Sequence, residues 1–117
     1  MNFLLRLVIT AVVAFALSYV LPGILIDTFW TAMVLSLVLA VLNSLLKPIL
    51  IILTLPITIL TFGFFLFIIN ALIVELASKF VGGFYVRSFG WALLFSLLLS
   101  LLTSLLYRDK DREEVDR

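Results

Sequence analysis

The side chains that could do chemistry in this chain are few, and four of them fall inside apolar runs: Asn43, Asn70, Glu75 and Lys79. An ionisable group in hydrocarbon is costly, and by default it is a functional candidate such as a proton or ion relay. Glu75 precedes Lys79 by four residues, which is the favourable order for an ion pair on one face of a helix. We therefore expect a half-buried ion pair here, and we rank a relay through Glu75 below it.

The other polar candidates point to structural roles. The amides of Asn43 and Asn70 need hydrogen-bond partners in hydrocarbon, so each should bond across helices or cap broken backbone near Pro48. Contact with a transported substrate is the alternative. Asp27 and Arg87 carry opposite charges at positions sixty residues apart. We expect these two side chains to pair on the external face.

Several kinds of site are excluded by what the chain lacks. It has no Cys and no His, and Asp27 and Glu75 are the only carboxylates ahead of a charged C-terminal tail. It has no glycine-rich phosphate loop, nucleophile–base pair or cluster of metal ligands. We expect no catalytic residue, no cofactor and no metal, and hence no enzyme. The net charge of +1 offers no footprint for nucleic acid, and no small-molecule ligand can be named.

The composition is that of a membrane protein. Hydrophobic residues make up 65% of the 117 residues and charged residues only 13%, whereas a soluble domain carries roughly a quarter charged residues. Such a chain cannot cover itself with polar surface in water. Its main contacts are therefore expected to be membrane lipids.

Two halves of the chain resemble each other at a constant offset of sixty residues. An internal repeat of this kind predicts one supersecondary unit used twice. The matched positions include glycines, phenylalanines and serines as well as leucines, among them Gly23 with Gly83, Phe29 with Phe89, Ala32 with Ala92, Ser36 with Ser96 and Ser44 with Ser104.

Four stretches approach the roughly 20 apolar residues that a spanning helix needs. They are Phe3–Leu21, Phe29–Leu46, Gly63–Val81 and Phe89–Tyr107. The expected fold is an all-α membrane protein whose four transmembrane helices form two tandem hairpins within one domain. The expected boundaries are domain 1–107, first repeat 5–47, linker 48–62, second repeat 65–107 and charged cytoplasmic tail 108–117.

The linker decides the topology. It is apolar but carries Pro48 and Pro56, and as one helix it would reach only about 22 Å, short of a ~30 Å hydrocarbon core. We therefore prefer a re-entrant or interfacial segment to a fifth span. Four spans with cytoplasmic termini leave only Lys79 and Arg87 as external cations, as the positive-inside bias favours.

Small residues recur every four positions on two of the expected spans. They are Ser36, Ala40 and Ser44 on the second span and Ser96, Ser100 and Ser104 on the fourth. Stripes of this kind let helix backbones approach closely in lipid. Close helix packing is the preferred interpretation, and the polar lining of a pore in an oligomer is the alternative.

Four motifs carry a resemblance to a known family. They are Asn43-Ser-Leu-Leu-Lys47-Pro48, Leu55-Pro56-Ile-Thr-Ile-Leu-Thr61-Phe-Gly63, Ile69-Asn70-Ala71-Leu72 and Gly83-Phe84-Tyr-Val86. Together they make the chain similar to the bacterial four-span phage holin family, superfamily IV, small membrane proteins of mostly unknown function. The resemblance implies a multi-pass protein of the bacterial cytoplasmic (inner) membrane.

Three functional hypotheses follow. The first is a holin-like protein that self-assembles in the bilayer and permeabilises it. The second is a non-catalytic scaffold or accessory subunit of a membrane complex or envelope-stress system. The third is a small ion or lipid transporter that uses Glu75. The small-residue stripes predict a homo-oligomer or a larger membrane complex in the first two cases.

Overall fold

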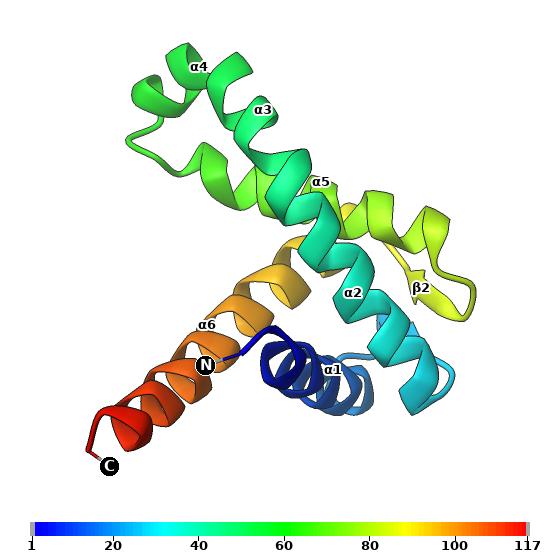
Figure 1. Cartoon of the computed structure of the whole chain (residues 1–117). Coiled ribbons are helices and arrows are strands. Elements are labelled where there is room, and N and C mark those ends of the chain that lie inside the picture. Colours follow the sequence, from blue (N-terminus) through cyan, green and yellow to red (C-terminus); the bar gives the residue numbers. More distant parts are fainter. Residues whose placement is uncertain (1, 117) are drawn as a thin grey trace.

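The computed structural model describes residues 2–116, and the side chains of residues 2–108. The chain is helical with one short β-ribbon, and an arm of two short helices separates two helical hairpins (Figure 1). The elements in chain order are α1 Phe3–Val20, β1 Ile24–Ile26, α2 Phe29–Leu45, α3 Lys47–Leu53, α4 Leu55–Leu60, α5 Phe65–Phe80, β2 Phe84–Val86 and α6 Phe89–Asp116.

The two hairpin loops pair with each other as strands. β1 and β2 run antiparallel, and Leu25 lies opposite Tyr85 at the centre of the ribbon. Each strand lies in the short loop that follows the first helix of its hairpin. Their pairing joins the halves of the chain through backbone hydrogen bonds.

Two further backbone hydrogen bonds extend the ribbon at its ends. The N–H of Asp27 donates to the carbonyl of Gly83 at 3.0 Å. The N–H of Arg87 donates to the carbonyl of Gly23 at 2.8 Å. Each bond links the end of one loop to the glycine that opens the other, so the N–H groups of Asp27 and Arg87 are paired with carbonyls of the opposite loop.

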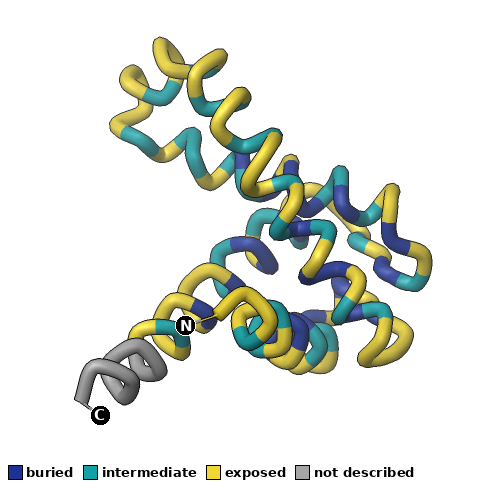
Figure 2. Tube along the Cα trace, viewed as in Figure 1, coloured by how far each residue is buried: buried dark blue, intermediate teal, exposed yellow. Residues whose placement is uncertain are grey.

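The helices pack across the two halves as well as within them. α1 contacts α2 and α6, while α5 contacts α6 and α2. Buried residues concentrate where the long helices pack against one another and against the ribbon (Figure 2). The arm of α3 and α4 has no buried residue. The largest fully buried side chains are Ile24, Leu35, Ile69, Ile73, Phe84 and Phe95.

The buried serine hydroxyls of α2 and α6 are satisfied locally. Ser36 donates to the Met33 carbonyl at 2.9 Å, and sixty residues later Ser96 does the same to the Leu93 carbonyl at 2.9 Å. Hydroxyls bonded in this way leave no polar group for the partner helix to satisfy. The buried part of each small-residue stripe therefore allows close packing.

Helix length limits how many spans can be assigned. α1 and the Phe89–Arg108 part of α6 are long and apolar enough to cross a membrane, and α2 with α3 makes a third span if a 42° bend is allowed within it. Among the described residues this gives two or three candidates where the sequence predicts four. α5 has 16 residues, which is short for a span.

The arm formed by α3 and α4 extends beyond the crossing of the long helices and contacts α5 (Figure 1). A proline lies in the first turn of each of its helices, where the missing N–H breaks no helical bond. α4 ends in a Schellman arrangement: the N–H of Gly63 donates to the carbonyl of Thr58 at 2.8 Å. Phe62, with φ of 55°, takes the left-handed position that glycine usually fills.

The charged tail was expected to begin at residue 108. The backbone of α6 continues into it as helix to Asp116. The side chains beyond Arg108 lie outside the described residues.

Gly23 is a testable point of close contact between the halves. A Cβ at this position would clash with the indole ring of Trp91, because the ring lies directly against the backbone there. We expect Gly23→Ala to destabilise the fold by about 1–3 kcal/mol, as overpacking does. Reversible unfolding in mixed detergent micelles measures the effect.

Gly82→Ala is the matched control, since a Cβ there would have no neighbour within 4 Å. Combining Gly23→Ala with Trp91→Ala should recover part of the loss by removing the ring. Equal stability of the Gly23 and Gly82 variants would contradict the contact.

Candidate functional site

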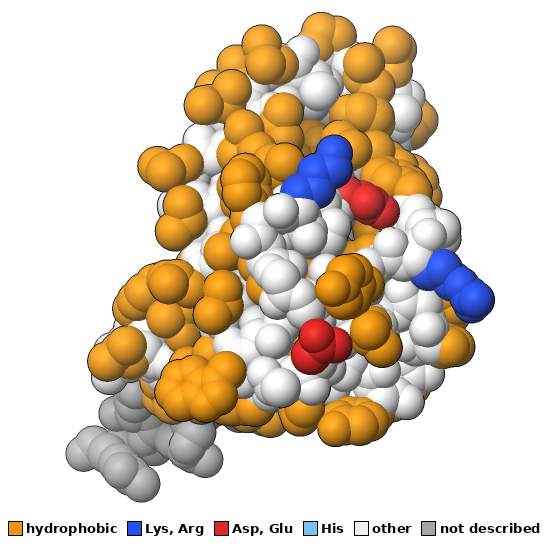
Figure 3. Space-filling view, turned by 90° about the vertical axis from the view of Figure 1, so that its right-hand side faces the viewer, with side chains coloured by type: hydrophobic (Ala, Val, Ile, Leu, Met, Phe, Trp, Pro, Cys, Tyr) orange, Lys and Arg blue, Asp and Glu red, His pale blue; other side chains and the backbone are white. Residues whose placement is uncertain are grey.

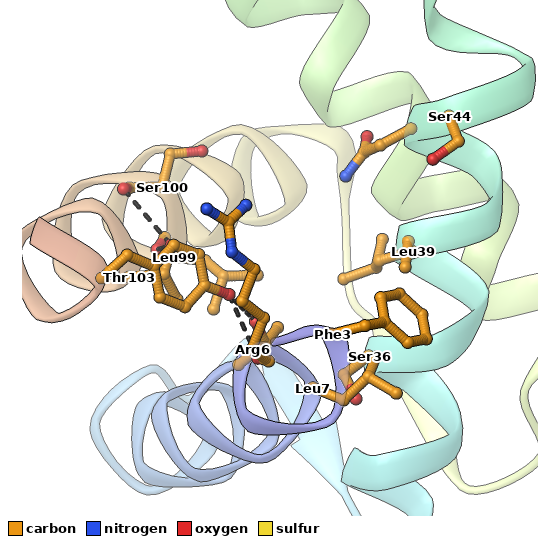
Figure 4. A pocket seen from close by; sticks show the side chains of 13 residues that line it. Phe3, Arg6, Leu7, Ser36, Leu39, Ser44, Leu99, Ser100 and Thr103 are labelled. Carbon is orange, nitrogen blue, oxygen red and sulfur yellow. Dashed lines mark hydrogen bonds between the residues drawn. The ribbon is translucent and has the colours of Figure 1, made fainter. Parts of the chain in front are cut away.

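A polar cavity of about 360 Å³ lies among α1, α2 and α6 (Figure 4). Phe3, Leu7 and Leu39 supply part of its apolar wall. Its polar lining comes from all three helices and consists of Arg6, Thr10, Ser36, Asn43, Ser44, Ser100, Thr103 and Tyr107. The surrounding helix surface is largely hydrophobic, and Figure 3 shows few charged side chains on the face it draws. The cavity is thus a polar interruption in an apolar exterior.

Tyr107 closes one end of this cavity by tying α6 to α1. Its hydroxyl donates to the carbonyl of Arg6 at 3.1 Å. Since this uses its only hydrogen, the hydrogen bond between the Thr10 and Tyr107 hydroxyls must be donated by Thr10. The guanidinium of Arg6 lies over the Tyr107 ring, 5.0 Å from its centroid, as in a cation–π contact.

A second, smaller cavity of about 60 Å³ adjoins the first. It shares four lining residues with the first: Leu39, Asn43, Leu99 and Ser100. Lys47, Asn70 and Ser96 complete its polar lining. The two cavities therefore form one polar strip that begins near Arg6 and ends at Lys47.

Asn43 and Asn70 were expected to bond across helices or to cap broken backbone. The structure brings them to the same small cavity. Lys47, the first residue of α3, also lines it. Neither amide makes a hydrogen bond to another group among the described residues. Both residues line the same cavity, where water or a bound polar group can supply partners for their amides.

The small-residue stripes divide between the two interpretations given to them. Ser36 and Ser96 are buried, as close packing requires. Ala40, Ser44 and Ser100 line the larger cavity, as Ser36 does, but they are less buried than Ser36. Ser104 is exposed and lines neither cavity, so the stripe on α6 leaves the cavity within one turn of Ser100.

Glu75 and Lys79 lie elsewhere. Both line a separate cavity of about 340 Å³ between α5 and the junction of α2 with α3, whose other walls are leucine and isoleucine side chains. Glu75 is half-buried and Lys79 is exposed. The structure therefore separates Glu75 from the two asparagines, and no single site contains all three.

The expected contact between Asp27 and Arg87 is wrong. The antiparallel register places Asp27 beside Gly83 and Arg87 beside Gly23, at opposite ends of the ribbon. Four residues of strand separate the two positions, which amounts to about 13 Å. Backbone hydrogen bonds, and not this charge pair, join the hairpins.

Comparison with known proteins agrees with the fold and the apolar exterior. Residues 1–105 match the model of a family described as mycobacterial 4 TMS phage holin, superfamily IV. The chain belongs to this family. It is accordingly an integral membrane protein with transmembrane helices, as the sequence motifs predict.

One curated relative is similar over most of its length. The uncharacterized membrane protein YvlD of Bacillus subtilis (strain 168) is 35% identical over 103 residues, which cover 87% of each chain. No solved structure matches this chain. Neither comparison attaches a ligand or a reaction to the polar strip.

Sequence reasoning missed the clasp at Tyr107. Thr10 and Tyr107 are 97 residues apart, and nothing in the local pattern of either helix relates them. Nothing in the sequence indicated that Arg6 belongs to a site, although its side chain lines the larger cavity (Figure 4).

The clasp gives a second prediction. Tyr107→Phe keeps the ring against Arg6 but removes both hydroxyl hydrogen bonds, and we expect a loss of about 1 kcal/mol in unfolding free energy. Tyr19→Phe is the control. Tyr19 is 78% exposed, its ring contacts Phe15, and its hydroxyl makes no hydrogen bond to another described residue. Unfolding in mixed micelles compares them, and equal losses would contradict the clasp.

Proposed function

We propose that this protein is a holin-like membrane protein that self-assembles in the bacterial cytoplasmic membrane and permeabilises or thins the bilayer. The observation that carries the proposal is the polar cavity, open at the surface of helices whose other faces are apolar. Hydrocarbon cannot satisfy its hydroxyl, amide and guanidinium groups. Water or a partner's polar groups must enter it.

The depth of the cavity supports a local thinning of the bilayer. Along α2 its lining runs from Ser36 to Ser44, a rise of about 12 Å at 1.5 Å per residue. A ~30 Å hydrocarbon core is therefore breached over a good part of its depth from one side. One chain makes a vestibule in this way, and a complete path requires assembly or further opening.

Helix length acts in the same direction. α2 has 17 residues and α5 has 16, which correspond to about 26 Å and 24 Å. Helices shorter than the hydrocarbon core thin the bilayer around them or associate with one another. Both responses are expected of a protein that perturbs membranes.

The architecture that we propose has four spans in one transmembrane domain, residues 1–107, with both termini cytoplasmic. The two hairpins form an internal repeat about a pseudo-twofold axis normal to the membrane. Three observations support this: the ribbon's self-complementary register around Leu25 and Tyr85, the matched bonds at its ends, and the matched serine bonds on α2 and α6. The linker, residues 48–62, is then a cytoplasmic-side arm in or on the bilayer.

Self-assembly is supported by polar groups that one chain leaves exposed. Asn43, Ser44 and Ser100 are exposed on α2 and α6, beside the larger cavity. In lipid, such residues associate with polar groups of neighbouring helices. A second copy of the chain offers the same groups, so we propose a homo-oligomer. We propose no catalytic activity for it.

A scaffold or accessory role uses the same surface for a different membrane partner, and it is the outcome if no flux is found. A transporter built on Glu75 with Asn43 and Asn70 has less support, because these residues line different cavities.

Dye release from liposomes tests the proposal. Purified protein should release a small trapped dye with a steep dependence on the protein-to-lipid ratio, as an assembling protein would. Ser100→Leu fills the cavity with an apolar side chain, and we expect release to fall at least about tenfold, the equivalent of roughly 1.4 kcal/mol.

Ser104→Leu is the matched control, since it makes the same change one turn along α6 outside the cavity. It should leave release within about twofold of the parent, which is below 0.5 kcal/mol. Absence of release from inserted, folded protein would reject permeabilisation and favour the scaffold role. An equal effect of both variants would reject the cavity as the path.

A further inference from the structure

We propose that the polar strip is a binding site for the phosphate of an anionic phospholipid headgroup, held between Arg6 and Lys47. Arg6 lines the larger cavity and Lys47 the adjoining one. No acidic side chain lines either cavity among the described residues. The strip is therefore cationic at both ends, which favours an anion.

The acidic residues in the described part of the chain lie away from this strip. Asp27 lies beside Gly83 at one end of the ribbon. Glu75 lines the separate cavity against α5. Neither carboxylate lines a cavity that contains Arg6 or Lys47.

The groups between the two cations are suited to a phosphodiester. The amide of Asn43 and the hydroxyls of Ser44 and Ser100 can donate hydrogen bonds to phosphate oxygens. Neither Asn43 nor Asn70 has another hydrogen-bond partner among the described residues, so their donors are available. Asn43 also lines both cavities, so it lies where the larger cavity meets the smaller one.

Arg6 is held ready for such a ligand. Its guanidinium lies over the Tyr107 ring and points into the cavity (Figure 4). The ring contact leaves the planar edge of the guanidinium free to form paired N–H···O bonds to a phosphate. The Tyr107 hydroxyl is bonded to Thr10 and to the Arg6 carbonyl, so the stacking ring is fixed.

The form of the cavity favours a lipid over a soluble anion. Its volume of about 360 Å³ falls within the range of small-molecule sites, about 300–1,000 Å³. Phe3, Leu7 and Leu39 line it beside the polar groups, which gives acyl or glycerol carbons an apolar wall. A free phosphate would leave these side chains in contact with water.

This proposal goes beyond bilayer permeabilisation and does not depend on it, since a scaffold would bind the same lipid. The test is lipid selectivity of purified protein in nanodiscs. Displacement of a fluorescent phosphatidylglycerol is measured with phosphatidylglycerol, phosphatidylcholine and inorganic phosphate as competitors. We expect phosphatidylglycerol to compete at least about tenfold better than phosphatidylcholine, and millimolar phosphate not to compete.

Variants assign the site. Arg6→Gln and Lys47→Gln together should weaken phosphatidylglycerol binding by about tenfold or more, as loss of charge-assisted bonds does. Lys79→Gln is the control, because this cation lies outside the strip. Arg6→Lys keeps the charge but loses the paired bonds of the guanidinium, so it should bind more tightly than Arg6→Gln and less tightly than the parent, which separates loss of charge from loss of fold.

Equal binding of both lipids, or a loss with Lys79→Gln as large as with the double variant, overturns the proposal. Displacement by inorganic phosphate alone, without lipid selectivity, would assign the strip to a soluble anion instead. Dye release is scored separately, so failure of one measurement leaves the other proposal standing.

Discussion

β1 and β2 satisfy each other's backbone groups, and the positions of all the long helices follow from that pairing. Backbone N–H and C=O groups that are buried away from water need partners inside the protein, so two partly buried extended loops gain by meeting. The antiparallel register, centred on Leu25 and Tyr85, fixes how the hairpins face each other. It brings α6 beside α1 and α2 beside α5, and the indole of Trp91 against Gly23.

The polar strip is a consequence of that arrangement. α1, α2 and α6 approach closely through buried small residues such as Ala14, Ser36 and Ser96, whereas Ser44 and Ser100 are exposed beside the cavity that opens toward the ends of these helices. The hydroxyl of Tyr107 joins α6 to α1 beside this cavity. One set of small residues thus allows packing in one part of the molecule and a polar cavity in the next.

Helix positions could be predicted from the sequence because Pro22, Gly23 and Gly83 interrupt apolar runs. The helices begin and end within about two residues of the predicted limits, except that α6 continues as helix to Asp116. The partner of each loop could not be predicted, since register depends on how whole hairpins pack. Equivalent residues of two antiparallel strands fall at opposite ends, which is why the pairing of Asp27 with Arg87 was wrong. The bond from Thr10 to Tyr107 had no local signal.

The central claim is that the polar strip holds water or headgroups while the neighbouring helix surface faces lipid. The chain has no cysteine, so single cysteines can be introduced without background. Ser100→Cys in the cavity and Leu101→Cys on the exposed apolar surface should be treated with a membrane-impermeant thiol reagent. Fast labelling at position 100 from the cytoplasmic side, with little at position 101, is predicted. Equal, slow labelling at both positions would contradict the account.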